Sequence, residues 1–168
     1  MDESCIPSAN EAEAVTPDES KSTIKSKSIR AAVFHESERA LEFCLFPRPQ
    51  LQRGEALVRI TCCTLCGSDL HTISGRRSEP SPSILGHEIL GVVEEVSSEP
   101  ALDVRGDSLK PGDRITWSVC VSCQSCERCR SGLPQKCHHL QKYGHALAEG
   151  RFALSGGLAE AILLRADS

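Results

Sequence analysis

The chain has 168 residues, a mildly acidic formal net charge of −4 and an ordinary apolar content of 39%. This length suffices for one domain with a sizeable core and is too short for two ordinary domains. The sequence contains no basic block that would neutralise phosphates, so no nucleic-acid partner is expected. No apolar run approaches the roughly 20 residues that span a bilayer, so no membrane association is expected either.

Cysteine is unusually frequent, with 10 residues in the chain. The N-terminus, Met1-Asp2-Glu3-Ser4-Cys5, is acidic and has no apolar core segment, which is not typical of a secretory signal. We therefore expect a cytoplasmic protein. In that reducing compartment clustered cysteines bind metal more often than they form disulfides.

Residues 1–28 are expected to form a disordered N-terminal tail. They are rich in Ser, Glu, Lys and Ala, include Pro7 and Pro17, and show almost no periodic apolar signal. Such a segment cannot bury enough surface to offset the entropy of ordering. Residues 29–168 are predicted to form one domain.

Short strands separated by Gly and Pro turns dominate this predicted domain. The runs Ile29–His35 and Leu41–Phe46 flank a polar loop and are expected to form a hairpin. Gly91 interrupts a β-branched strand and predicts a bulge or a close backbone approach. Further strands are expected over Glu55–Cys63, His87–Val96, Arg114–Trp117 and Gly157–Arg165. One or two helical turns are expected at Ser68–Ser74 and an exposed loop at Arg76–Ser83. The pattern predicts a mainly β fold, as a small barrel or sandwich.

The segment from Cys66 to Glu88 concentrates polar and metal-ligating side chains. It begins Cys66-Gly67-Ser68-Asp69-Leu70-His71 and ends Gly86-His87-Glu88. Cysteine and histidine are zinc ligands, and Ser68 and His71 carry groups that can transfer a proton. Taken singly, these residues have simpler interpretations as a buried thiol, a helix cap, satisfied imidazoles and a solvated charge. If the chain performs chemistry, we expect it here.

A second cysteine cluster lies in residues 120–145, which lack regular periodicity. Its spacing is C-x2-C-x2-C-x7-C, in which one loop can wrap a tetrahedral zinc ion with four thiolates and no open position. The members are Cys123, Cys126, Cys129 and Cys137. The alternatives are a disulfide pair, unliganded buried cysteines, or an iron–sulfur cluster, which fits this compact spacing less well. Cys120 continues the three-residue phase and is expected to be a spare thiol.

Together these motifs resemble the zinc-containing medium-chain alcohol dehydrogenase family over Ile29–Ser168. The resemblance rests on Cys66–His71, on Gly86-His87-Glu88 followed by Gly91, and on the cysteine lobe after Gly112-Asp113-Arg114. It implies a mainly β, GroES-like partial barrel with a structural-zinc lobe over residues 120–145. In finer detail, Leu65–Glu88 and Gly132–Cys137 resemble a subgroup associated with phosphonate catabolism.

The resemblance also implies a role for each residue of the first segment. Cys66 and His87 would bind a catalytic zinc ion, with Glu88 beside it, and Asp69 would orient His87. Ser68 would accept the hydroxyl proton of a small-molecule alcohol, and His71 would relay it outward. Zinc would act as a Lewis acid while NAD(P) takes the hydride, giving an aldehyde or ketone. Cys123, Cys126, Cys129 and Cys137 would be the structural-zinc ligands.

The sequence departs from the family pattern in three respects. Ser97 stands where a small residue, mostly glycine, is usual, and the loop Ser97–Leu109 is longer than common. The third ligand of the family's catalytic zinc lies beyond the last predicted strand, and Glu160 is not a convincing substitute. No G-x-G-x-x-G follows a strand, so the Rossmann cofactor domain is expected to be absent.

Two functional hypotheses follow. The first is the N-terminal catalytic portion of a zinc-dependent alcohol dehydrogenase, incomplete by itself and with an incomplete catalytic zinc site. The alternative is a non-catalytic zinc-binding module or truncated remnant that acts through a partner chain. Apolar surface left exposed by a missing domain predicts a homo-oligomer or a complementing chain.

Overall fold

The computed structural model describes residues 27–165 of the chain. Nearly all of the predicted tail, residues 1–28, lies outside the described residues. β1 (Ser28–Val33) begins one residue before the predicted start of the domain.

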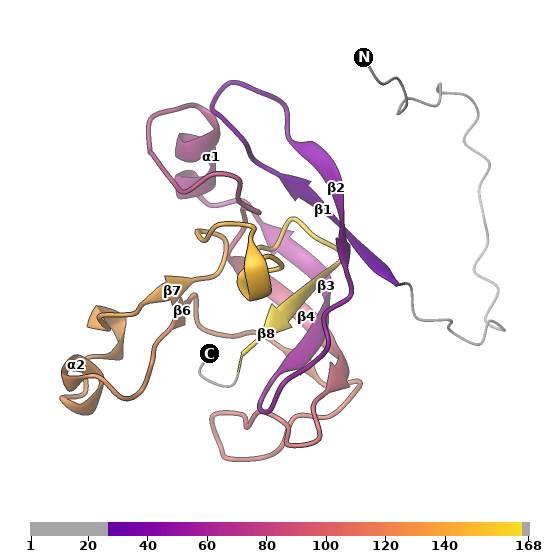
Figure 1. Ribbon diagram of the computed structural model, residues 1–168, viewed down its shortest axis with the longest axis vertical. Coiled ribbons are helices and arrows are strands. Elements are labelled where there is room, and N and C mark those ends of the chain that lie inside the picture. The colour runs from indigo at the N-terminus through magenta and orange to yellow at the C-terminus, as the bar shows by residue number, and fades with distance from the viewer. Residues whose placement is uncertain (1–26, 166–168) are drawn as a thin grey trace, which may run out of the picture.

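β1 and β2 (Glu42–Pro47) form the predicted antiparallel hairpin as a separate two-stranded sheet. Successive strand residues point to opposite faces, so Ile29, Ala31 and Val33 share one face, which is buried. That face packs with Leu57 of the main sheet in an apolar cluster. The hairpin thus closes one side of the fold, beside the main sheet (Figure 1).

The main sheet has four antiparallel strands in the order β5-β4-β3-β8. The strands span Ala56–Thr64 (β3), Glu88–Val96 (β4), Arg114–Ile115 (β5) and Ala161–Leu164 (β8). β5 and β8 are shorter than predicted. The expected close approach at Gly91 is confirmed, because a Cβ there would lie 2.4 Å from Val58 Cγ1. The β3–β4 register shifts next to this glycine, between Ile60 and Cys62.

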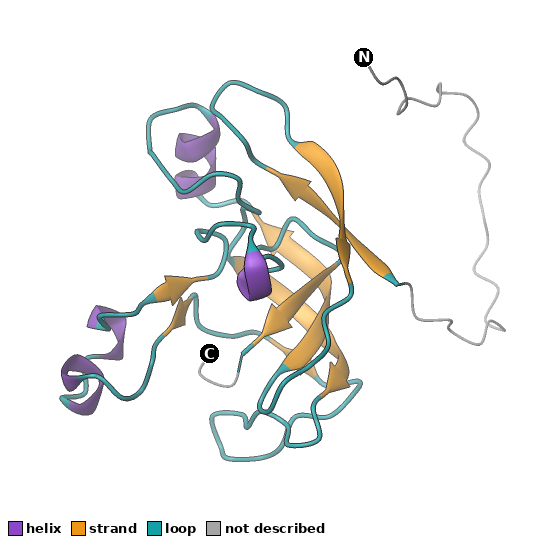
Figure 2. Cartoon of the chain, viewed as in Figure 1, coloured by secondary structure: helices purple, strands orange, loops and turns teal. Residues whose placement is uncertain are grey.

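Helical structure is sparse, and Figure 2 shows strands and loops dominating the chain. α1 (Gly67–Ile73) matches the predicted helical turns and follows β3 directly. α2 (Glu127–Arg130) and the 3-10 turn η1 (Pro134–Lys136) lie between the short paired strands β6 (Cys120–Val121) and β7 (Gln141–Lys142). These four elements form a lobe that projects from the barrel (Figure 1). A second 3-10 turn, η2 (Gly150–Phe152), precedes β8.

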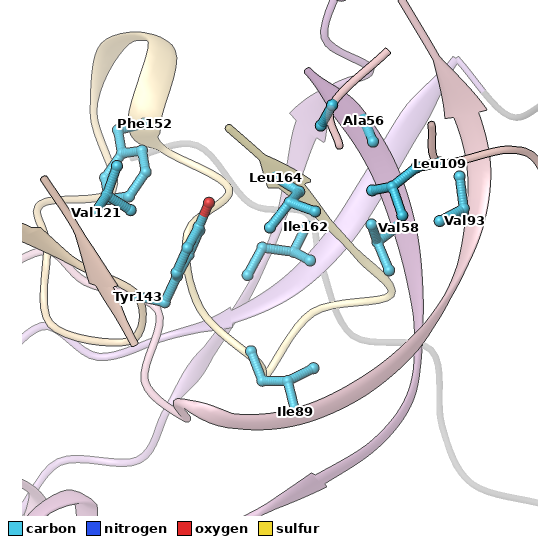
Figure 3. Close-up of a cluster of buried hydrophobic side chains, with 11 residues drawn as sticks. Ala56, Val58, Ile89, Val93, Leu109, Val121, Tyr143, Phe152, Ile162 and Leu164 are labelled. Carbon is cyan, nitrogen blue, oxygen red and sulfur yellow. The ribbon is translucent and has the colours of Figure 1, made fainter. Parts of the chain in front are cut away.

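The larger apolar cluster joins the base of the lobe to the main sheet. Figure 3 shows Val121, Tyr143 and Phe152 beside Ile162 and Leu164 of β8. The Tyr143 ring is fully buried and lies 5.4 Å from the Phe152 ring, and its hydroxyl accepts the Arg165 N–H at 3.0 Å. The protruding lobe is therefore anchored by aromatic packing at its base.

Ser97, the departure noted from the family pattern, has a structural reason. Its buried hydroxyl accepts the Gly54 N–H at 3.1 Å and donates to the Glu99 carbonyl at 2.6 Å. The side chain thereby ties the turn before β3 to the end of β4. Within residues 27–165, no helix combines the length and apolar character needed to cross a bilayer.

Candidate metal and catalytic site

Asp69 connects the two segments that carry the predicted zinc ligands. Cys66 stands immediately before α1, and its N–H donates to Asp69 Oδ2 at 2.9 Å. The other carboxylate oxygen, Oδ1, accepts the Gly86 N–H at 3.1 Å and lies 3.6 Å from His87 Nδ1. The Asp69 side chain is completely buried. One desolvated carboxylate therefore fixes the start of α1 against the start of β4.

This arrangement brings together three of the predicted residues. The Cys66 thiol, a ring nitrogen of His87 and a carboxylate oxygen of Glu88 all lie within 4.8 Å of one another. Glu88 is exposed, and its Oε2 accepts the Thr64 hydroxyl at 2.5 Å. The predicted set was two ligands with a nearby carboxylate. The structure instead gathers three candidate ligands.

The donor set fits a catalytic zinc ion. One thiolate, one imidazole and one carboxylate are all zinc ligands, and three protein ligands leave a fourth position for a reactant. The proximity of His87 Nδ1 to the carboxylate of Asp69 leaves the opposite nitrogen, Nε2, for the metal, as in carboxylate–histidine–zinc arrangements. Glu160 lies elsewhere, with its carboxylate 2.9 Å from Arg30, so it takes no part in this group.

The two predicted proton-transfer residues lie on α1. Ser68 is half-buried and His71 is exposed, and their i, i+3 spacing places them on the same side of the helix. The Thr72 hydroxyl donates to the backbone carbonyl of Ser68 at 3.0 Å, so this contact does not involve the Ser68 hydroxyl. Neither residue belongs to the group of candidate metal ligands.

His145 is a site residue that the sequence did not indicate. Its ring lies against that of His87, with centroids 4.6 Å apart and planes tilted by 35°. The side chain is 8% exposed, and its Nδ1 lies 3.3 Å from Glu79 Oε1. Burial lowers the pKa of His145 below its ordinary value, although the Glu79 carboxylate opposes that shift. Burial therefore favours the neutral imidazole.

Most residues of the loop Arg76–Ser83 are exposed, as predicted, and Glu79 is an exception. Its side chain is only 9% exposed, and it pairs with Arg77 at 2.5 Å as well as with His145. Ser83, at the end of the same loop, is fully buried and pairs with Phe34 through both backbone groups. Glu79 and the C-terminal end of this otherwise exposed loop are therefore packed against the rest of the fold.

A glycine turn presses His145 against the His87 segment. Gly144 has φ +73°, and a Cβ there would lie 2.5 Å from the Gly86 carbonyl oxygen and 3.0 Å from His87 Cβ. The Gly144 N–H donates to the Ser155 carbonyl at 2.7 Å. No residue with a side chain fits this approach without a shift of the backbone.

The four lobe cysteines also converge. Their sulfur atoms all lie within 4.8 Å of one another, with Cys126 Sγ 3.5 Å from Cys129 Sγ and 3.9 Å from Cys137 Sγ. All are free thiols, so the disulfide alternative is wrong for this conformation. Cys120 lies outside the group, as the spare-thiol prediction requires.

Backbone N–H groups point at the sulfurs of this cluster. The N–H groups of Cys123 and His139 donate to Cys137 Sγ, and that of Cys126 donates to Cys123 Sγ, each at 3.3 Å. Hydrogen bonds from Ser125 lower the pKa of Cys123 to about 5, whereas burial and the neighbouring thiols raise that of Cys129 to about 12. The negative thiolate form is thus favoured at Cys123 and opposed at Cys129. A bound cation would remove the repulsion between neighbouring thiolates, so this arrangement suits a metal ion.

Cys62 and Cys63 are consecutive residues of β3 and therefore point to opposite faces. Cys63 packs so closely that a Cβ on Gly86 or Gly157 would lie 2.6 Å or 2.3 Å from its sulfur. Burial raises the pKa of Cys63 to about 11, which suits a packing thiol. Cys62, in contrast, is exposed.

Comparison with known proteins places this geometry in context. Residues 52–168 match the model of the alcohol dehydrogenase GroES-like domain. An alcohol dehydrogenase from Geobacillus stearothermophilus is 38% identical over 143 residues, which are 83% of this chain and 38% of the relative. This chain therefore spans well under half the length of that relative.

Solved structures of dehydrogenases also align with this chain over part of their length. An alcohol dehydrogenase from Thermotoga maritima aligns with a TM-score of 0.75 and 33% identity, over 83% of this chain and 39% of that one. A zinc-binding dehydrogenase from Sinorhizobium meliloti, bound to NADP, aligns with a TM-score of 0.64 and 28% identity, over 84% and 37%.

Proposed function

This chain belongs to the alcohol dehydrogenase GroES-like domain family, and we propose that it forms the zinc-binding catalytic part of an oxidoreductase. The proposed reaction converts a small alcohol to an aldehyde or ketone, with transfer of hydride to NAD(P). The cofactor would be bound by a domain that is not recognisable among residues 27–165, where no parallel βαβ unit occurs. The nine free thiols of the described residues support a reducing compartment such as the cytoplasm.

The observation that carries the proposal is the link made by Asp69. A fully buried carboxylate is costly unless it is satisfied, and here it accepts two N–H groups and faces an imidazole. All three contacts serve to hold Cys66 and His87 together. A fold that needed only packing at this point would gain more from an apolar residue.

Each residue of the site then has a defined task. Cys66, His87 and Glu88 would hold the zinc ion. When bound, zinc supplies Lewis acidity at the alcohol oxygen, and NAD(P) accepts the hydride. Ser68 would take the hydroxyl proton, and His71, which is exposed on the same side of α1, would pass it to solvent.

His145 and Glu79 are proposed as positioning residues. The His145 ring covers one face of His87, and Glu79 holds that ring in place from behind. Asp69 fixes the edge of His87 and His145 limits its rotation, so the imidazole keeps one orientation before any reactant binds.

A finer hypothesis concerns the substrate. The resemblance of Leu65–Glu88 and Gly132–Cys137 to a subgroup associated with phosphonate catabolism supports a phosphonate-derived alcohol or aldehyde. The second candidate function is a zinc-binding module that acts through a partner chain, supported by the complete cysteine lobe.

The reaction can be tested by fusing this chain to the cofactor-binding part of the Thermotoga maritima relative. NAD(P)H formation is followed with simple alcohols, polyols and a hydroxyalkyl phosphonate. We expect activity that falls at least about 100-fold in Ser68→Ala, the usual scale of a lost proton acceptor. A fusion that carries metal at Cys66 and His87, yet oxidises none of these alcohols, would favour the binding module.

A further inference from the structure

We propose that the β1–β2 hairpin carries an additional zinc site, built from His35, Glu42 and Cys44. The three residues contribute an imidazole nitrogen, a carboxylate oxygen and a thiol sulfur that all lie within 4.8 Å of one another. They share no residue with the cysteine lobe or with the group at Cys66. The inference is independent of the proposed oxidoreductase activity.

The antiparallel register explains why these residues meet. Glu42 lies opposite Val33, and Cys44 lies opposite Ala31, on neighbouring strands. Glu42 and Cys44 are two residues apart on β2 and therefore share a face. His35 follows β1 by two residues and lies close to both of them. Two ligands from β2 and one from the segment just after β1 converge at the loop end of the hairpin.

The separations are close to those of a zinc site. Bond lengths of about 2.0–2.3 Å in tetrahedral geometry place ligand atoms roughly 3.3–3.8 Å apart. From separations of up to 4.8 Å, movements on the order of 1 Å by side chains bring all three donors to bonding distance. Glu42 is exposed and His35 and Cys44 are half-buried, so a water molecule can complete the shell.

An unsatisfied atom marks the position of the missing partner. His35 Nε2 is buried and makes no hydrogen bond, although Glu42 Oε2 lies 3.2 Å away. The backbone beneath the ring is fixed, because the His35 carbonyl accepts the Ser81 hydroxyl and the neighbouring Phe34 pairs with Ser83. A buried ring nitrogen that makes no hydrogen bond is costly, and a cation shared with Glu42 and Cys44 would satisfy it.

A simple ion pair between His35 and Glu42 is the competing interpretation. It does not account for the free thiol of Cys44, which lies with the pair within 4.8 Å. With a thiolate as the third donor, the set favours zinc over magnesium or calcium, which prefer oxygen ligands. Bound zinc would cross-link the end of β1 to the start of β2.

The test uses the full chain and measures iodoacetamide alkylation of each cysteine by peptide mass spectrometry, with and without added zinc. A coordinated thiolate is shielded from the reagent, so zinc should slow modification of Cys44 at least about tenfold. His35→Gln should abolish this protection and Glu42→Gln should weaken it. Glu36→Gln, an exposed carboxylate in the same hairpin loop, should leave it intact.

Two internal references keep the result interpretable. Cys62, which belongs to none of the metal-ligand groups, should react at the same rate with and without zinc. Zinc protection of Cys123 and its lobe partners should persist in His35→Gln, which shows that the variant is folded. Equal Cys44 rates with and without zinc in the wild-type chain would overturn the proposal. So would undiminished Cys44 protection in His35→Gln.

Discussion

Asp69 is the residue on which the candidate site depends most. Its two carboxylate oxygens reach Cys66, Gly86 and His87, so one side chain sets the relative position of both predicted ligands. Asp69, inside the Cys66–His71 motif, thus holds the ligands in position and also supplies a negative charge. Helix capping, the simpler interpretation of Asp69, is also present through its contact with the Cys66 N–H, and both roles are served by the same atoms.

Asp69→Asn should weaken metal binding at Cys66, His87 and Glu88 by about 10- to 100-fold. The amide offers one acceptor oxygen where the carboxylate offers two, so either the Cys66 or the Gly86 N–H loses its partner. Zinc titration against a competing chelator measures the affinity. Asp107→Asn, at an exposed carboxylate, is the matched control. Equal affinities for the wild type and Asp69→Asn would show that Asp69 does not position the ligands.

The pair formed by Glu79 and His145 makes a separate prediction. In Glu79→Leu/His145→Leu, apolar residues of similar size replace a buried polar pair, which is often neutral or stabilising for the fold. We expect an unchanged or raised melting temperature together with metal affinity at the Cys66 site reduced about tenfold. Unfolding monitored by circular dichroism gives the first quantity, and chelator competition gives the second. Unchanged affinity in the stable double variant would mean that the pair only fills space.

At the scale of elements, the turn at Gly144 determines how the lobe meets the candidate metal site. It brings the strand that leaves the lobe into contact with the segment that starts β4. The contact is between backbones, because the Gly144 Cα approaches the Gly86 carbonyl. His145 reaches His87 only because no side chain separates the two segments.

Gly144→Ala should therefore cost both stability and metal affinity. Gly106→Ala is a matched control, because Gly106 also has positive φ, +87°, but a Cβ there meets nothing within 4 Å. The control should lose about 1–2 kcal/mol from left-handed strain alone, and Gly144→Ala about 1–3 kcal/mol more from the clash. Urea denaturation measures the free energies of unfolding. Equal losses in the two variants would contradict the close approach.

Elements with strong local signals were predictable, and contacts between distant segments were not. The hairpin, β3, β4, α1 and the cysteine spacing follow from residue patterns within a few positions. The burial of Glu79 could not be predicted in this way. It depends on a contact with His145, which lies far later in the chain, and the residues around Glu79 give no sign of that contact. The same holds for the cluster at His35, whose members are ordinary hairpin residues until the register aligns them.

The short final strand has a comparable cause. Gly157 begins the predicted strand and Gly156 precedes it, yet both lie against the segment before β4 and do not pair with β3. A Cβ at Gly156 would lie 1.9 Å from the Ile84 carbonyl oxygen, and the Gly157 N–H donates to Gly86. Pairing with β3 begins only at Ala161. These two glycines are a site of tight packing.

At the scale of the whole molecule, the outer face of the hairpin is exposed and apolar. Phe43 and Leu45 are two residues apart on β2 and therefore share that face, and they are 76% and 70% exposed. Patches of this kind are typical of contact surfaces, and we propose that this one is a contact surface. It supports the expectation of an oligomer or a complementing chain.

Phe43→Thr/Leu45→Thr should reduce self-association of the chain. Removing two large apolar side chains from a contact costs about 1.5–3 kcal/mol each, so the dissociation constant should rise at least about tenfold. Sedimentation velocity across a concentration series measures it. Val104→Thr, at an exposed valine in the loop after β4, should change nothing. A wild-type chain that stays monomeric throughout would contradict the prediction.

The central claim is that Cys66, His87 and Glu88 form a metal site, and cobalt substitution tests it most directly. The chain is prepared as Cys44→Ser, to exclude the hairpin, with its cysteine lobe already filled by zinc, and is then titrated with Co²⁺. We predict a thiolate-to-cobalt charge-transfer band and the intense visible bands of a low-coordinate site. These bands should vanish when Cys66→Ser is added and persist when Cys62→Ser is added. Identical cobalt spectra with and without the Cys66 thiol would contradict the account.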